Sequence, residues 1–161
     1  MWQQVFDIFV LLLAANGAPI LAAWALGARA AWAVDLGRCL PGGRPLLGPS
    51  KTWRGLLAAL LGVSLVAVLL GYSASFGLIF AALAMTGDLV SSFIKRRLGV
   101  APSDRSPGLD QLPEALLPSL YAVWTLELPW WWVLLLPLLF TAAQVLVSEP
   151  LFRMKIRRRP H

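Results

Sequence analysis

Long apolar blocks alternate with short polar segments along this chain. A helix that crosses a bilayer needs about 20 mainly apolar residues, and five blocks have that character. The predicted helices run roughly from Val5 to Leu26, Gly55 to Leu70, Phe76 to Phe93, Glu114 to Leu128 and Trp130 to Val147. We therefore expect an all-α polytopic membrane protein with about five transmembrane helices, forming a single integral membrane domain over residues 1–161.

Composition supports a lipid-facing exterior. Hydrophobic residues make up 58% of the chain and charged residues 14%, against roughly 25% charged in an ordinary soluble domain. The single cysteine, Cys39, excludes an internal disulfide and offers no metal-ligand spacing. The segment before the first apolar block, Met1 to Gln4, carries no Lys or Arg, whereas a secretory signal begins with positive charge. We interpret the first block as a retained helix.

Positive charge is confined to three places. The 14 Lys and Arg residues are Arg29, Arg38, Arg44, Lys51 and Arg54 after the first helix, Lys95, Arg96, Arg97 and Arg105 after the third, and Arg153, Lys155, Arg157, Arg158 and Arg159 after the fifth. With five spans these places share one face, and the positive-inside rule makes that face cytoplasmic. The pattern predicts an N-terminus outside the plasma (inner) membrane, cytoplasmic loops at about 27–54 and 94–113, and a basic cytoplasmic tail at about 150–161.

The long loops favour chemistry at the cytoplasmic surface, since long connections are usually functional. Trp130, Trp131 and Trp132 stand where an outer aromatic belt is expected. Although the net charge is +6, no nucleic-acid-binding motif is visible. We therefore read the basic residues as a topology signal and an attraction to the lipid bilayer, and expect no nucleic acid partner.

The end of the third helix carries a polar face. At helical spacing, Asp88, Ser91, Ser92 and Lys95 lie on one side. A carboxylate suits Mg²⁺ and a cation suits phosphate, so the face suits a metal–nucleotide complex. Anchoring of the helix end would also explain Lys95 and its basic neighbours, but it does not explain an acid inside an apolar span, which is a functional hypothesis by default.

The start of the second helix is a second candidate. Lys51 and Arg54 lie on one side of a helix N-terminus, whose free N–H groups attract anions. The Walker A pattern is absent. A phosphate site and a basic interfacial anchor both explain these residues.

Two further positions remain open. Asp110 could cap the fourth helix, or could pair with Glu114, four residues on, as a metal ligand. Asn16 lies mid-membrane, three residues before Pro19, which leaves the carbonyl of Ala15 without its usual donor. The Asn16 amide could repair that break, bond across to another helix or line a polar cavity.

Taken together, these residues resemble a known family. The pattern is Gly87-Asp88, Ser92, Lys95-Arg96 and Asp110-Gln111, preceded by Lys51-Thr52-Trp53-Arg54-Gly55. It is similar to the CDP-archaeol synthase family, a compact relative of the CDP-diacylglycerol synthases, and the resemblance extends from Asn16 to Glu114. The string from Gly87 to Gly99 and the Lys-Thr-Trp-Arg-Gly motif are both specific, and they occur in the expected order and loops.

The resemblance implies a five-helix enzyme, with its active site facing the cytoplasm, that uses CTP and Mg²⁺. A membrane lipid phosphate, either phosphatidate or an unsaturated ether-lipid analogue, would become a CDP-lipid with release of pyrophosphate. Carried over by position, Asp88, Lys95 and Asp110 would be catalytic. The metal would bind Asp88, Asp110 and Glu114, and the nucleotide or lipid phosphate would bind Lys51, Arg54, Ser92, Arg96 and Gln111.

The chain departs from the family pattern in three respects. One is that the family's His and Asn near the last helix have no clear counterparts around Gln144 to Phe152. The archaeal pattern carries a second acid three residues after the first, where this chain has Pro113 followed by Glu114. The basic end, Arg153 to His161, is more similar to bacterial members. Two other functions stay open: a CTP-dependent lipid kinase, which would release CDP and a phosphorylated lipid, and a non-catalytic membrane scaffold, which would not bind CTP.

Overall fold

The computed structural model describes residues 1–41, 43–100 and 111–153, with side chains as far as residue 146. That part of the chain is helical, with only isolated bridges in its loops. The helices are α1 (Trp2–Leu26), α2 (Trp53–Leu69), α3 (Ala74–Arg97), α4 (Gln111–Thr125) and α5 (Trp132–Arg153). The five predicted helices are confirmed, each within a few residues of its expected bounds, except that α3 and α5 continue further at their C-terminal ends.

Two of the described helices, α1 and α3, are long and apolar enough by themselves to cross a membrane. The segments Trp53–Leu69 and Trp132–Leu146 are apolar but shorter. The number of helices that span the bilayer and their orientation therefore remain predictions.

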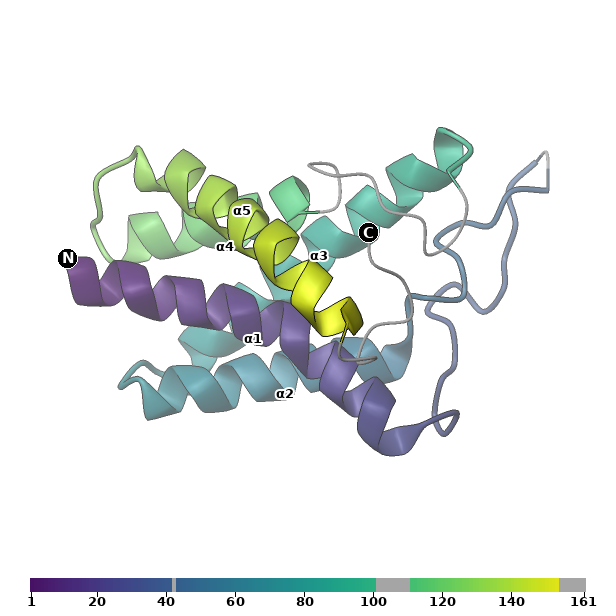
Figure 1. Ribbon diagram of the computed structural model, residues 1–161, viewed down its shortest axis with the longest axis horizontal. Helices are drawn as coiled ribbons and strands as arrows, with labels where there is room; N and C mark the ends of the chain where they lie inside the picture. Colours follow the sequence, from purple (N-terminus) through teal and green to yellow (C-terminus); the bar gives the residue numbers. More distant parts are fainter. Residues whose placement is uncertain (42, 101–110, 154–161) are drawn as a thin grey trace.

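Each helix packs against the next one along the chain, and α1 also contacts α5, so the bundle closes on itself. In Figure 1 the N-terminus and the short α2–α3 and α4–α5 connections lie at one end of the bundle. The long 27–52 segment and the C-terminal end of α3 lie at the other end. The up-and-down path of the chain therefore brings the two candidate motifs, before α2 and near the end of α3, to the same end of the bundle.

The packing of α2 places small side chains inside and large ones outside. Ala59, Val63 and Ala67 are fully buried at four-residue spacing, whereas the outward stripe is strongly exposed. The outward stripe consists of Leu57, Leu61, Leu65 and Leu69, with exposures of 55–75%. A water-soluble bundle would bury its leucines, so this distribution fits a helix whose outer face contacts lipid and whose inner face permits close approach.

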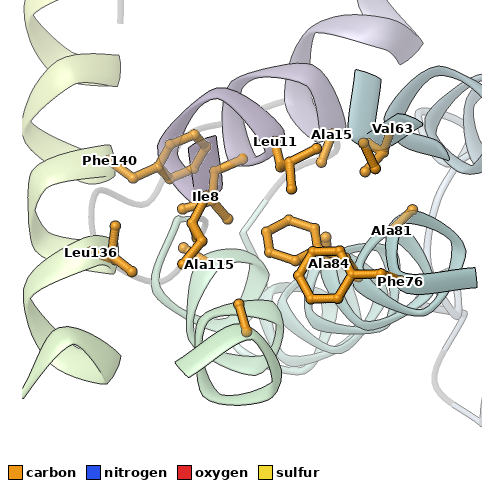
Figure 2. Packing of buried hydrophobic residues seen from close by; sticks show 14 of the residues in the cluster. Ile8, Leu11, Ala15, Val63, Phe76, Ala81, Ala84, Ala115, Leu136 and Phe140 are labelled. Atoms are coloured by element: carbon orange, nitrogen blue, oxygen red, sulfur yellow. The ribbon is translucent and has the colours of Figure 1, made fainter. Parts of the chain in front are cut away.

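All five helices contribute to the apolar core. Figure 2 shows Ile8, Leu11 and Ala15 of α1 facing residues from the other helices. These include Val63, Phe76, Ala81, Ala84, Ala115, Leu136 and Phe140. Small residues on α3 keep the helices close, which holds the polar face near the end of α3 inside the bundle.

The 27–52 segment is organised around one buried acid. The carboxylate of Asp35 accepts hydrogen bonds from the backbone N–H groups of Gly37 (3.0 Å), Leu47 (2.9 Å) and Gly48 (2.9 Å). Burial alone would raise the pKa of Asp35, but the N–H donors of Gly48, Leu47 and Gly37 outweigh burial and lower that pKa below 3.8. The segment therefore has a defined path through the residues that lead to Lys51.

This segment is also tied to α2 and α3. The backbone carbonyl of Lys51 accepts a hydrogen bond from the N–H of Val34 (2.8 Å). The side-chain oxygen of Thr52 caps α2 by accepting a hydrogen bond from the N–H of Gly55 at 3.2 Å. Arg44 Nη1 donates to the carbonyl of Arg97 (2.7 Å), and Arg97 Nη2 donates to the carbonyl of Pro45 (2.7 Å). The reciprocal arginine bonds hold the loop against the C-terminal end of α3.

Candidate active site

A lysine and an aspartate from separate candidate motifs meet inside the bundle. Lys51 Nζ lies 2.6 Å from Oδ1 and 2.7 Å from Oδ2 of Asp88, so the ammonium spans both carboxylate oxygens. Each side chain is 23% exposed, which leaves the pair partly open to water. Lys51, two residues before α2, and Asp88 of α3 therefore form one site, which sequence spacing alone did not establish.

The predicted polar face of α3 points into the protein. Ser91, Ser92, Lys95 and Arg96 are all buried, with exposures of at most 7%. Because cationic side chains are almost never fully buried unless they are paired, this face is built for polar or ionic contacts. It runs from Asp88 toward the C-terminal end of α3 and supplies hydroxyls and cations on the helix that carries Asp88.

Glu114, in the first turn of α4, supplies a buried carboxylate. Asn16 of α1 donates its side-chain amide to both carboxylate oxygens of Glu114, at 3.1 Å to Oε1 and 3.3 Å to Oε2. Of the roles left open for Asn16, the structure selects the bond across to another helix.

A close approach of backbones brings α4 to the acid of α3. A side chain at Gly87 would collide with the carbonyl group of Pro113, and its Cβ would lie 2.8 Å from the Cα of Glu114. Only glycine fits there. The helix turn that carries Glu114 therefore lies directly against the residue that precedes Asp88.

Arg54, for which the resemblance implies a phosphate-binding role, contacts the end of α1 in this structure. Its Nη1 donates to the backbone carbonyls of Gly27 (2.8 Å) and Arg29 (2.7 Å). These carbonyls lie at the C-terminal end of α1, where carbonyl groups without a donor in the helix attract cations. In this arrangement Arg54 ties the end of α1 to the start of α2.

The remaining predicted residues are placed as follows. Gln111 is buried at the start of α4, and Asp110 lies outside the described residues. Within the described part of the chain, no three His, Cys, Asp or Glu side chains gather into a metal-binding group.

Two residues outside the predicted set shape the site or the loop that leads to it. Asn16 was noticed as an intramembrane polar residue, and that signal is the one that marks it. Asp35 was not considered, although it is the only acid between Gly27 and Arg54. A lone acid in a basic, Gly-rich loop is a signal that could have identified it.

Comparison with known proteins is consistent with this geometry. A family model described as CarS-like, CDP-archaeol synthase, matches residues 1–157. CDP-archaeol synthases from Hyperthermus butylicus and Aeropyrum pernix are 40% and 38% identical; each alignment covers 68% of this chain, and 67% and 65% of the relatives. The aligned region thus spans about two thirds of these relatives' own length.

A solved structure has the same fold. It is described as an intramembrane enzyme for archaeal membrane lipid biosynthesis, and it superimposes with a TM-score of 0.70 at 29% identity. The match covers 86% of this chain and 91% of that one.

The helical bundle with its buried charged face, together with these matches, defines an integral membrane enzyme of the CTP-dependent cytidylyltransferase class. Within that class, the chain belongs to the CarS-like CDP-archaeol synthase family.

Proposed function

We propose that this protein transfers the cytidylyl group of CTP to the phosphate of a membrane lipid at the cytoplasmic surface. The observation that carries the proposal is the Lys51–Asp88 pair, which joins the two candidate motifs within the buried polar face of α3. A phosphate oxygen of the lipid attacks the α-phosphorus of CTP. The bond from that phosphorus to the bridging oxygen of the β-phosphate breaks, giving CDP-lipid and pyrophosphate.

Such a reaction depends mainly on positioning and on neutralising negative charge. Lys51, Lys95 and Arg96 supply positive charge for the triphosphate and the lipid phosphate, while Ser92 and Gln111 offer hydrogen bonds to the nucleotide. The ammonium of Lys51 is held at Asp88 before the substrate binds. Binding of CTP would let this ammonium turn from the carboxylate to a phosphate oxygen.

Mg²⁺ fits the oxygen donors at this site. Asp88 and Glu114 lie on helix turns in backbone contact at Gly87, and carboxylates with substrate phosphates are the ligands that Mg²⁺ prefers. We propose that Asp88 and Glu114 hold the ion, and the resemblance adds Asp110. When bound, the ion would withdraw charge from the phosphate oxygens.

The lipid would reach the site laterally from the membrane, and CTP would enter from the cytoplasm. The relatives are CDP-archaeol synthases, and we extend to this chain the proposal that its lipid is an unsaturated ether-lipid phosphate, with phosphatidate as the competing substrate. The N-terminus is proposed to lie outside, because every Lys and Arg then falls on the cytoplasmic side.

Purified protein in detergent, incubated with radiolabelled CTP, Mg²⁺ and three lipids, tests the proposal. The lipids are phosphatidate, an unsaturated archaeal ether-lipid phosphate and a polyprenol. We expect a CDP-lipid from one of the two phosphates. A phosphorylated polyprenol with free CDP would replace the proposal with a lipid kinase, and absence of both product and CTP binding would leave a scaffold.

Asp88→Asn is the matched variant, because it keeps size and polarity but removes the charge that binds Lys51 and the metal. We expect a loss of CDP-lipid formation of at least about 10²-fold, with unchanged membrane insertion and yield. Wild-type turnover in Asp88→Asn would refute the assignment of Asp88.

A further inference from the structure

The hydrogen bond between α1 and α4 assigns a function to a residue that the reaction described above does not use. Asn16 Nδ2 bonds both oxygens of Glu114 across a separation of 98 residues in the chain. A primary amide has two N–H donors, so it can address both oxygens of one carboxylate at once. Such a contact limits rotation of the Glu114 carboxylate about its last bond.

The chemistry of the contact suits an ion-binding carboxylate. Asn16 is neutral, so its contribution is to orient Glu114 without removing the negative charge. A lysine in the same place would compete with a cation, as Lys51 does at Asp88.

The turn of α4 that carries Glu114 packs against α3 beside Asp88. The backbone of α4 at Pro113 and Glu114 touches Gly87, which adjoins Asp88. Meanwhile α1 contacts both α3 and α4 in the bundle. Asn16 of α1 thus binds Glu114, while α3 meets the same turn of α4 at Gly87.

From this arrangement we propose that Asn16 is a positioning residue, which sets the Glu114 carboxylate for the divalent cation that accompanies the nucleotide. The proposal rests on the proposed function, since it needs the cation at Asp88 and Glu114. Groups that orient metal ligands typically change metal affinity by about 10–100-fold when removed.

The test measures binding of Mn²⁺, as a substitute for Mg²⁺, by the loss of free-Mn²⁺ EPR signal in the presence of a non-hydrolysable CTP analogue. Asn16→Leu keeps size but removes the donors, and we expect at least about a 10-fold rise in the Mn²⁺ dissociation constant. Asn16→Gln keeps an amide on a longer stem, and we expect it to recover part of the affinity. Thermal unfolding in detergent identifies any variant that has lost its fold.

A double-mutant comparison separates positioning from simple destabilisation. If Asn16 acts through Glu114, adding Asn16→Leu to Glu114→Gln weakens Mn²⁺ binding by less than about 2-fold beyond Glu114→Gln alone. Full additivity, or folded Asn16→Leu with wild-type Mn²⁺ affinity, would overturn the proposal. So would unchanged affinity in Glu114→Gln when Asp88→Asn abolishes binding, an outcome that leaves the proposed function intact. Failure of wild type to bind Mn²⁺ with the analogue would overturn both.

Discussion

Replacement of Gly87 by alanine is the most direct test of the packing that assembles the site. The added Cβ would lie 2.8 Å from the Cα of Glu114 and would collide with the carbonyl group of Pro113. Carbon atoms pack best at roughly 3.5–4.0 Å, so α4 must retreat by about 0.7–1.2 Å at Glu114. The obstruction is backbone, which cannot rotate away as a flexible side chain could.

The energetic cost follows from two opposing effects. Overpacking of a filled interior costs typically about 1–3 kcal/mol, and a backbone obstacle places Gly87→Ala at the upper end. Alanine gains about 1 kcal/mol over glycine in helix propensity. We therefore expect a net loss of about 2 kcal/mol in the free energy of unfolding. A displacement near 1 Å at catalytic groups can also lower turnover by about 10²-fold.

The assay is SDS-induced unfolding in detergent micelles, followed by helical circular dichroism, with CDP-lipid formation measured on the same preparations. Gly17→Ala is the matched control, since it lies in the interior of α1 with nothing within 4 Å of the added Cβ. We expect that control to be as stable as wild type or more stable by up to about 1 kcal/mol. Equal stability of Gly87→Ala and Gly17→Ala would refute the close approach of α3 and α4.

Two further predictions concern the end of the bundle that carries the 27–52 segment. Because the pKa of Asp35 is lowered in the folded protein, its stabilising contribution should be present above about pH 3.8 and disappear as the pH falls through the lowered pKa. Asp35→Asn should lower the free energy of unfolding by about 1–3 kcal/mol at neutral pH and should flatten this acid dependence in thermal unfolding. Parallel pH curves for the variant and the wild type would contradict the assignment. Arg54→Lys keeps the positive charge but loses the planar guanidinium group. We expect a lower melting temperature and a KM for CTP within about 2-fold of wild type. A raised KM at unchanged stability would instead favour the phosphate-binding role that the resemblance implies.

The helices themselves could be predicted from the sequence because their signal is local. An apolar block long enough to cross a bilayer must satisfy its backbone internally, and a helix does so within one segment. Caps such as Thr52 and Ser73 lie at the starts of α2 and α3 and accept from N–H groups three residues on. The inward face of α3 was predicted equally well, because helical spacing alone brings its polar residues to one side.

The pairing of side chains could not be predicted in this way. The sequence placed Lys51 and Arg54 on one side of a helix start, as a phosphate site or a basic anchor. In the structure Lys51 binds Asp88, and Arg54 binds the end of α1. Both residues carry the same local signal. Their different partners depend on where the loop leaves α1 and how α2 packs against α3.

By itself, then, the sequence determined the helices, the segregation of positive charge and the chemical character of each candidate group, since composition and local periodicity carry that information. Only the tertiary structure decided that Asn16 binds Glu114 and that α4 touches α3 at Gly87. Contacts of this kind join residues that are far apart in the chain, and they depend on the distance between packed helices. That distance is set by the packing of all five helices together, so no local pattern in the chain predicts it.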